Sequence, residues 1–400
     1  MVNTVYIVGA ARTPTAPIDT SLRCVPATTL GAIAIQQAVS RSHVPPDLFS
    51  DVHMGLALQA GVGQAPAKQA AIQGGLASEI EAITINKVCA SGLRAVISAA
   101  QNIQLDHAVA QVAGGMESMS NVPRYLKRGE DSEPKGIPIP DGLTLDGLTN
   151  PWDGRSMGAC ADEVADRMAI SRKDQDDYAI RSYERFRHAC KTGAHCEEIA
   201  PVSLTSGATG LVAADHLPHE SVFNRIRKLS SCFSIGGTIT SGNASSLSDG
   251  ASAVALVNAE LARSFCLSNR ILAKIVTYAD ASAAPHEFAM APAKAIQKVL
   301  ACAHLSVEQI DLWEINEAFA MVVLVTQQIL GIDPTTINVN GGALASGHPL
   351  GSSGCRILVS LLHQLSHGQY GVAAVCNGGG GATAVLIQRV DNQDLEVDSP

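Results

Sequence analysis

Residues 83–101 read ITINKVCASGLRAVISAAQ, and the pattern of this stretch changes once along its length. Ile83, Thr84 and Ile85 open it with β-branched side chains, which is typical of a strand. Apolar residues then recur at steps of three and four, which predicts a helix. Cys89 lies at the corner between the two, where the free N–H groups and the dipole of a helix start favour a thiolate. We therefore expect the pKa of this thiol to be depressed.

A buried structural cysteine is the second interpretation of this corner. Free cysteine is among the residue types found most often in protein interiors. The stretch alone leaves both interpretations open, and motifs near the other end of the chain are needed to choose between them.

The composition is that of an α/β enzyme with about two or three domains. Of its 400 residues, 46% are hydrophobic, 16% are charged and only 4% are aromatic, and there are 35 glycines for close backbone packing. The net charge of −9 argues against general binding to nucleic acid, so no nucleic-acid partner is expected.

The expected location is the cytoplasm. Ten cysteines are scattered without the spacing of a disulfide framework, which indicates reduced thiols. The first residues, MVNTVYIVGAARTP, lead directly into a strand and show no targeting pattern. No apolar run approaches the length of a membrane span, so no membrane partner is expected either.

The two parts of the chain have similar element patterns. Strands and helices alternate from residue 5 to residue 119, which predicts a mostly parallel sheet covered on both faces. Residues 121–155 are rich in proline and glycine and interrupt this alternation, so residues 120–246 are expected to be an insertion. The alternation then resumes, and four later segments echo four earlier ones: 271–280, 311–320, 337–362 and 371–376.

Four stretches carry reactive or polar groups that core packing does not require. They are VCASG around Cys89, NEAFA from Asn316, GGALASGHPLGSSG around His348, and VCNGGGGA around Cys376. Each has an innocent interpretation by itself, such as a loop histidine or a tight turn. Together, two cysteines, a histidine and an asparagine at strand-end corners form a set suited to thiol-based acyl transfer.

With these motifs the chain resembles the thiolase family over residues 1–391. GMESMSNVP, NEAF, GGAxxxGHPxGxSG and CNGGGG are highly specific in combination, and EFAMAP looks closest to the mitochondrial acetoacetyl-CoA type and its bacterial relatives. The resemblance implies an α/β thiolase fold: a five-layered αβαβα core from two related βαβαβαββ halves, plus an inserted loop domain. The implied boundaries are 1–119 with 247–270 for the first half, 120–246 for the loop domain, 271–391 for the second half and 392–400 for a tail.

The resemblance also implies the activity of an acetyl-CoA C-acetyltransferase. This is reversible thiolysis of acetoacetyl-CoA by coenzyme A, through an acetyl group on Cys89. His348 matches the base beside Cys89, and Cys376 matches the cysteine that moves the α-proton. Asn316 matches the residue that holds a water in one oxyanion hole, and the N–H groups of Cys89 and Gly378 match a second hole.

Further residues match positions that contact the substrate. Phe288, Met157 and Phe319 are expected to form a short apolar acyl pocket. NRIRK, with Arg225 and Lys228, is locally basic and is either a solvated turn or a contact for the phosphates of coenzyme A. The remaining matched positions are Ser156, where many members have His or Asn, and Ser245 and Ala318 along the pantetheine channel.

No cofactor or metal is expected, because coenzyme A is itself substrate and product. Members of the mitochondrial type bind a monovalent cation partly through a tyrosine of the loop domain. Residues 205–235 contain no tyrosine, so the resemblance does not predict potassium activation. The segment SNVPRYLKRG from Ser120 is similar to that of tetrameric members and implies a homotetramer.

Three alternatives stay open from the sequence. One is a thiolase for longer 3-ketoacyl-CoA chains, and another is a thiolase-like protein that binds acyl-CoA without turnover. The related decarboxylating condensing enzymes are the third, although they use histidines where this chain has Cys376.

Overall fold

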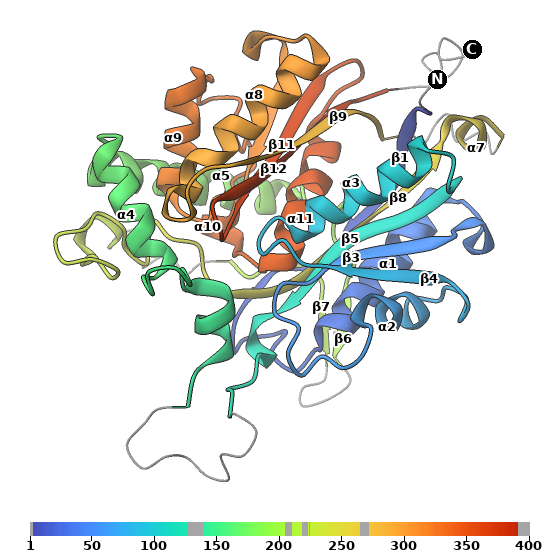
Figure 1. The fold of residues 1–400 in the computed structure, drawn as a ribbon, viewed down its shortest axis with the longest axis horizontal. Coiled ribbons are helices and arrows are strands. Elements are labelled where there is room, and N and C mark those ends of the chain that lie inside the picture. The colour runs from blue at the N-terminus through green and yellow to red at the C-terminus, as the bar shows by residue number, and fades with distance from the viewer. Residues whose placement is uncertain are drawn as a thin grey trace.

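The computed structural model shows one large body (Figure 1). The expected tail, 392–400, lies outside the described residues, as do parts of the insertion. The structure describes residues 3–126, 139–204, 210–217, 223, 225–264 and 272–390.

The N-terminal half supplies one part of a ten-stranded sheet. Its buried strands are almost uninterrupted runs of apolar and small residues, as expected for a sheet that is covered on both faces. A short strand, β2 (Ala16–Pro17), extends along β8. The five main strands lie in the order β1 (Val5–Arg12), β8 (Ser248–Asn258), β5 (Ala110–Ser118), β3 (Asp51–Gly55) and β4 (Glu81–Ile85).

The C-terminal half supplies the other part in the equivalent order. Ile337 forms a parallel bridge to Trp313, in the place that β4 has in the first half. The two parts are joined where Tyr6 and Ile7 pair with Lys274 and Ala273. The strands lie in the order β9 (Ala273–Ser282), β12 (Gly381–Gln388), β11 (Tyr370–Asn377) and β10 (Leu312–Ile315).

The sheet is mixed, so the prediction of a mostly parallel sheet is wrong. β3 pairs in parallel with β4 and β5, and β10 pairs in parallel with β11. Every pair that involves β1, β8, β9 or β12 is antiparallel. β12 follows β11 through a tight turn instead of a helical crossover, and hydrophobic patterning does not reveal strand direction.

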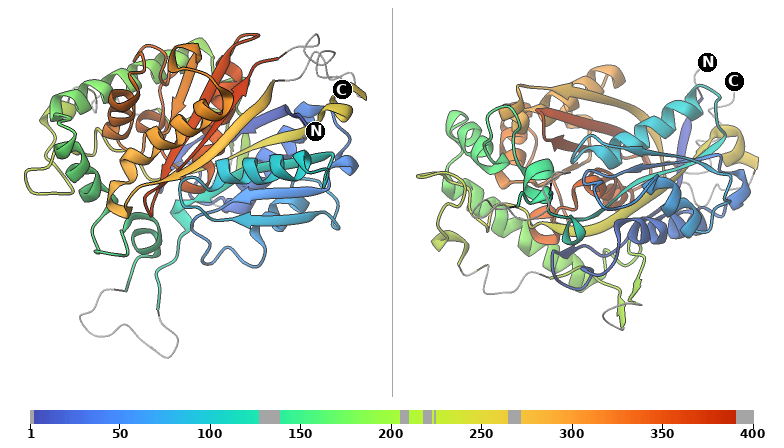
Figure 2. Two further views of the ribbon diagram at one scale, coloured as in Figure 1. Left: turned by 45° about the horizontal axis from the view of Figure 1, so that its top comes forward. Right: turned by 60° about the horizontal axis from the view of Figure 1, so that its bottom comes forward.

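Helices cover both faces of the sheet and also fill the space between its two parts (Figures 1 and 2). One core packs α1 and α2 on the N-terminal strands, and another packs α8 and α9 on the C-terminal strands. A third core holds α3 and α11 between the two sets of strands, which gives the expected αβαβα layers. These helices are α1 (Ala27–Ser42), α2 (Pro66–Gln73), α3 (Ser91–Gln104), α8 (Ala291–Ala303), α9 (Ala320–Leu330) and α11 (Leu350–Gln364).

The inserted segment packs against both halves. Its helix α5 (Arg172–Thr192) begins with a capping box of Ser171 and Asp174 and ends at Gly193. Tyr178 and Phe186 of α5 join the C-terminal core, whereas Val202 of the β6–β7 hairpin joins the N-terminal core. The other elements of the insertion are η2 (Met119–Asn121), η3 (Leu143–Leu148), α4 (Met157–Arg167), β6 (Val202–Leu204), β7 (Gly210–Val212) and η4 (Ile226–Lys228).

Short helices complete the described part of the chain. None of the helices described has the length and hydropathy needed to cross a bilayer. The short elements are η1 (Pro46–Leu48), α7 (Ala259–Ser264), η6 (Pro285–Met290), η7 (Val307–Gln309) and α10 (Ala343–Ser346).

Glycines allow the first turns of α3 and α11 to touch. A Cβ at Gly92 would lie 2.7 Å from the carbonyl oxygen of Gly351, and a Cβ at Gly354 would lie 2.7 Å from the Cβ of Leu93. Because real Cβ atoms do not approach that closely, both positions require glycine. Cys89 lies two residues before α3 and His348 two residues before α11, so this contact brings the two side chains to the same place.

We predict that Gly354→Ala destabilises the protein by about 1–3 kcal/mol through overpacking against Leu93. Helix propensity alone predicts the opposite sign, a gain of about 1 kcal/mol for alanine inside a helix. Urea unfolding followed by circular dichroism measures the difference. A variant as stable as the parent, or more stable, would contradict the close contact of the two helices.

Candidate active site

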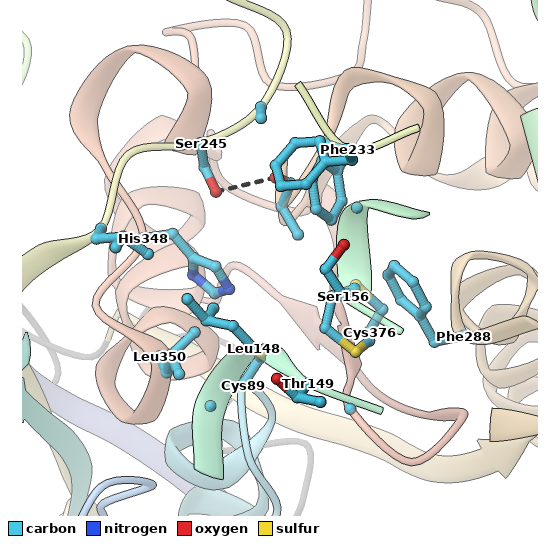
Figure 3. A pocket seen from close by; sticks show the side chains of 18 of the residues that line it. Cys89, Leu148, Thr149, Ser156, Phe233, Ser245, Phe288, His348, Leu350 and Cys376 are labelled. Atoms are coloured by element: carbon cyan, nitrogen blue, oxygen red, sulfur yellow. Dashed lines mark hydrogen bonds between the residues drawn. The ribbon is translucent and has the colours of Figure 1, made fainter. Parts of the chain in front are cut away.

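A cavity of about 510 Å³ opens where the corners of the two halves meet the inserted segment (Figure 3). The side chains of Cys89, His348 and Cys376 reach it from three different corners. The lining is Cys89, Thr144, Gly147, Leu148, Thr149, Ser156, Met157, Gly158, Cys232, Phe233, Ser241, Ala244, Ser245, Ser246, Leu247, Phe288, Ala318, Phe319, His348, Leu350, Cys376, Asn377 and Gly378.

The corner that carries Cys89 is a strained and tightly bonded turn. Val88 has φ +50°, which is a left-handed conformation that β-branched residues rarely adopt. Ser91 holds the turn closed, since its Oγ donates to the Val88 carbonyl at 2.6 Å and accepts from the Lys87 N–H at 2.8 Å. The position of Cys89 is therefore fixed by the backbone rather than by its own packing.

The environment of Cys89 differs from the sequence-based expectation. Burial raises the pKa of the thiol to about 12, although the backbone N–H groups of Gly378 and of Cys89 itself act in the opposite direction. The buried carboxyl of Glu117 contributes further to the increase. The expected depressed pKa considered the helix start but not the desolvation of a partly buried thiol. The resting group is a thiol, and it needs a base to become a nucleophile.

His348 is held by residues 245–246, which also contact the corner that carries Ala318. Its N–H donates to the Ser246 carbonyl at 3.0 Å, and the Ser245 N–H donates to the Ala318 carbonyl at 3.1 Å. Burial lowers the pKa of the imidazole to about 3, and the positive charge of Arg356 lowers it further. A neutral imidazole beside the cavity can accept a proton, which is what a general base requires.

Asn316 contacts His348 but is not part of the cavity lining. Its Nδ2 is 3.4 and 3.5 Å from the two ring nitrogens, and its buried Oδ1 has no partner. An unsatisfied buried oxygen of this kind suits a bound water. The adjacent Glu317 has a structural role, because it accepts hydrogen bonds of 2.7 Å from both Tyr178 and Ser182 of α5.

Cys376 lies near the end of β11, and Gly378 is the first residue of the turn that leads to β12. Cys376 is 1% exposed, and burial raises the pKa of its thiol above the usual range. Gly379 and Gly380 have φ values of +87° and +85°, which only glycine adopts readily. This turn directs the Gly378 N–H at the Cys89 thiol, so an oxyanion formed on a group attached to Cys89 would meet that donor.

The three residues expected to form the acyl pocket lie together in the cavity lining. Phe288 is buried, its ring lies 6.2 Å from that of Phe319, and Met157 lines the cavity beside them. Ser245 donates its hydroxyl to the Ala318 carbonyl at 2.9 Å. Ser156 also lines the cavity.

The structure explains the serine at residue 156 as a helix cap. Its Oγ accepts the Ala159 N–H at 3.1 Å at the start of α4. The Ser156 hydroxyl therefore accepts a backbone N–H at the start of α4 and also faces the cavity.

Arg225 and Lys228 lie apart from the cavity lining. Both are exposed, at the start and the end of η4. Their contact with phosphates stays a prediction.

Several residues at the site were missed by sequence reasoning. Phe233 lies edge-on against Phe319 at 5.9 Å and lines the cavity with Cys232, but one aromatic in a glycine-rich loop carries no specific signal. Glu117 accepts N–H groups of Ala57 at 3.0 Å and Gly351 at 2.8 Å, and burial raises its pKa to about 7. A charged residue within an apolar strand could have indicated it.

No group of three or more histidine, cysteine, aspartate or glutamate side chains suited to a metal ion occurs among the described residues.

Two similar proteins are named acetyl-CoA acetyltransferases. Acetyl-CoA acetyltransferase erg10A, mitochondrial, of Aspergillus fumigatus is 49% identical over 97% of this chain and 91% of its own length. Acetyl-CoA acetyltransferase, mitochondrial, of Bos taurus is 45% identical over 97% of this chain and 92% of its own length.

These names contradict the cytoplasmic location expected from the sequence, because both relatives are described as mitochondrial. The expectation depended on reduced cysteines and on the first residues of the chain. Reduced cysteines do not distinguish these compartments.

A solved structure gives the same fold. The Acat5 thiolase of Ascaris suum, in complex with coenzyme A, superposes with a TM-score of 0.92 at 39% identity, over 97% of this chain and 100% of that chain. The model of the thiolase N-terminal domain matches residues 5–260, and that of the thiolase C-terminal domain matches residues 269–389. The chain therefore belongs to the thiolase family.

Proposed function

We propose that the protein is an acetyl-CoA C-acetyltransferase, which catalyses reversible thiolysis of acetoacetyl-CoA by coenzyme A. The observation that carries this proposal is the meeting of two thiols and a neutral imidazole in one cavity, with the Gly378 N–H directed at one thiol. The names of the relatives support the same activity.

In the first step, Cys89 attacks the ketone carbon of acetoacetyl-CoA while His348 accepts the thiol proton. The carbon–carbon bond then breaks, which leaves an acetyl group on Cys89 and the enolate of acetyl-CoA. The enolate oxygen is stabilised by the protonated imidazole and by a water on Asn316, whose unpartnered Oδ1 supports this role. Cys376 gives its proton to the α-carbon, and acetyl-CoA is complete.

In the second step, a molecule of coenzyme A attacks the acetyl group on Cys89. Cys376, now a thiolate, accepts the thiol proton of coenzyme A. The oxyanion of this intermediate faces the N–H groups of Cys89 and Gly378. When it collapses, acetyl-CoA leaves and Cys89 regains the proton that His348 had held. Both steps balance with no redox cofactor, and run in reverse they condense two acetyl-CoA molecules.

The inserted segment, residues 120–246, is proposed to hold coenzyme A. Much of the cavity lining comes from it, including Leu148, Met157 and Phe233. The exposed Arg225 and Lys228 of the same segment are proposed to contact its phosphates. A homotetramer is proposed on the resemblance of the segment from Ser120, whose residues 127–129 lie outside the described part.

A thiolase for longer chains is the second candidate, and binding without turnover is the third. The buried ring of Phe288 and its neighbour Phe319 favour a short acyl group, because they close the cavity beside Cys376. The presence of all four reactive groups favours turnover.

We predict that loss of acetoacetyl-CoA on addition of coenzyme A is faster than loss of 3-ketopalmitoyl-CoA. The absorbance of the 3-ketoacyl thioester enolate follows both reactions. Thiolysis of the long chain at an equal or higher rate would favour the second candidate. Binding of acetoacetyl-CoA with no thiolysis at all would favour the third.

We predict that the nucleophilicity of Cys89 depends on His348, because the resting thiol is protonated. His348→Asn should slow alkylation of Cys89 by iodoacetamide at neutral pH by roughly 10²-fold, the scale of general-base catalysis. Peptide mapping also follows exposed Cys302 as an internal control, whose alkylation should not change. Equal alkylation of Cys89 in both proteins would mean that it is a thiolate without a base.

We predict that Cys376→Ala stops exchange of the methyl protons of acetyl-CoA in deuterated water, because no group remains to move the α-proton. Cys89 should still be alkylated in this variant. Cys160→Ala is the matched control, since Cys160 is buried in the same apolar core without lining the cavity. Exchange at the parental rate in the Cys376 variant, measured by mass spectrometry, would place the proton shuttle elsewhere.

A further inference from the structure

Ser353 contacts the catalytic imidazole from a place that the reaction steps above do not use. It lies in the first turns of α11, is fully buried, and has its Oγ 2.5 Å from Nδ1 of His348. The same Oγ lies 2.9 Å from the Pro349 carbonyl oxygen, four residues earlier in the chain. The hydroxyl therefore lies between a carbonyl and a ring nitrogen.

The number of hydrogens that each group carries determines the direction of these two hydrogen bonds. A hydroxyl has one hydrogen, and a carbonyl oxygen can only accept. Donation from a helical serine to the carbonyl four residues earlier is a common arrangement. When the Ser353 hydrogen points at Pro349, only the lone pairs of Oγ face Nδ1, so the ring must carry its proton on that nitrogen.

The other polar neighbour of the ring, Asn316, does not determine which ring nitrogen carries the proton. Asn316 Nδ2 is nearly equidistant from the two ring nitrogens, at 3.4 and 3.5 Å. The choice between the two neutral forms of the imidazole therefore depends on Ser353. A proton on Nδ1 leaves the lone pair on Nε2, which is the ring nitrogen that Ser353 does not contact.

We infer that Ser353 is a positioning residue that holds His348 in the Nδ1–H tautomer, with Nε2 directed at the thiol of Cys89. This inference depends on the proposed function only in taking His348 as the base for Cys89. Without the Ser353 oxygen, the ring can rotate or carry its proton on Nε2. In that state the nitrogen that faces the thiol cannot accept a proton.

The test compares Ser353→Ala with Ser352→Ala. Ser352 is the adjacent residue on the same helix, is equally buried and contacts Ser252 rather than His348. Ser353→Ala should lower kcat for thiolysis roughly 10- to 100-fold with KM retained, the scale of losing a partner that orients a histidine. Ser352→Ala should keep the parental kcat. Equal effects of the two changes would show a general packing role and overturn the inference.

Alkylation of Cys89 by iodoacetamide supplies a readout that does not need turnover. Ser353→Ala should slow it in the parent background but have no further effect in His348→Asn, because the two changes remove one function. Additive effects in the double variant would contradict the inference even if thiolysis is confirmed. If the protein instead shows no thiolysis, the alkylation rates of Cys89 in the single and double variants still test the role of Ser353.

Ser353→Cys provides a second variant of similar size in case the alanine variant does not fold. Sulfur is a weak acceptor, so this variant should also slow alkylation of Cys89. A folded cysteine variant with the parental alkylation rate would overturn the inference.

Discussion

Contact between the first turns of α3 and α11 is the constraint on which the site depends. Each helix belongs to a different half of the chain, and each carries a reactive residue two positions before its start. Gly92 and Gly354 allow the helices to approach to a distance that any Cβ would prevent. Glu117 links the same region, because it binds the N–H of Gly351 at the start of α11 and the N–H of Ala57 in the N-terminal half. The active site is therefore a product of how the two halves pack.

This packing also determines the protonation of the reactive groups. Burial raises the pKa of Cys89 and lowers that of His348, so both are neutral at rest. A charged thiolate–imidazolium pair would have to be kept in a desolvated place, which is costly. A neutral pair avoids that cost, and in the proposed reaction charge develops only when a substrate carbonyl accepts it, close to the Gly378 N–H and Asn316. Preorganised donors of this kind are most effective in a cavity that excludes water.

Sequence analysis predicted the candidate site residues that lie in short, specific motifs. Cys89, His348, Cys376 and Gly378 lie in motifs at strand-end corners and line one cavity, whereas Asn316 contacts His348 from outside that lining. The layered fold was implied by the resemblance to the thiolase family. Strand direction was predicted wrongly, because strands that are buried on both faces have the same apolar pattern beside parallel and antiparallel neighbours. The direction of the pKa shift of Cys89 was also predicted wrongly, because burial is a tertiary property and outweighs the local helix start. The place of Phe233 likewise depends on which distant segments meet, whereas the contact of Ser353 with His348 is local and joins residues five positions apart in one motif.

The central claim is that the packing of the two halves makes Cys89 the group that is acylated. Mass spectrometry of the protein after incubation with acetyl-CoA and rapid acid quenching tests it directly. We expect one acetyl group per chain, on the peptide that contains Cys89, and its loss when coenzyme A is added before the quench. An acetyl group on Cys376 or Cys232 instead, or none under conditions where thiolysis proceeds, would contradict the account.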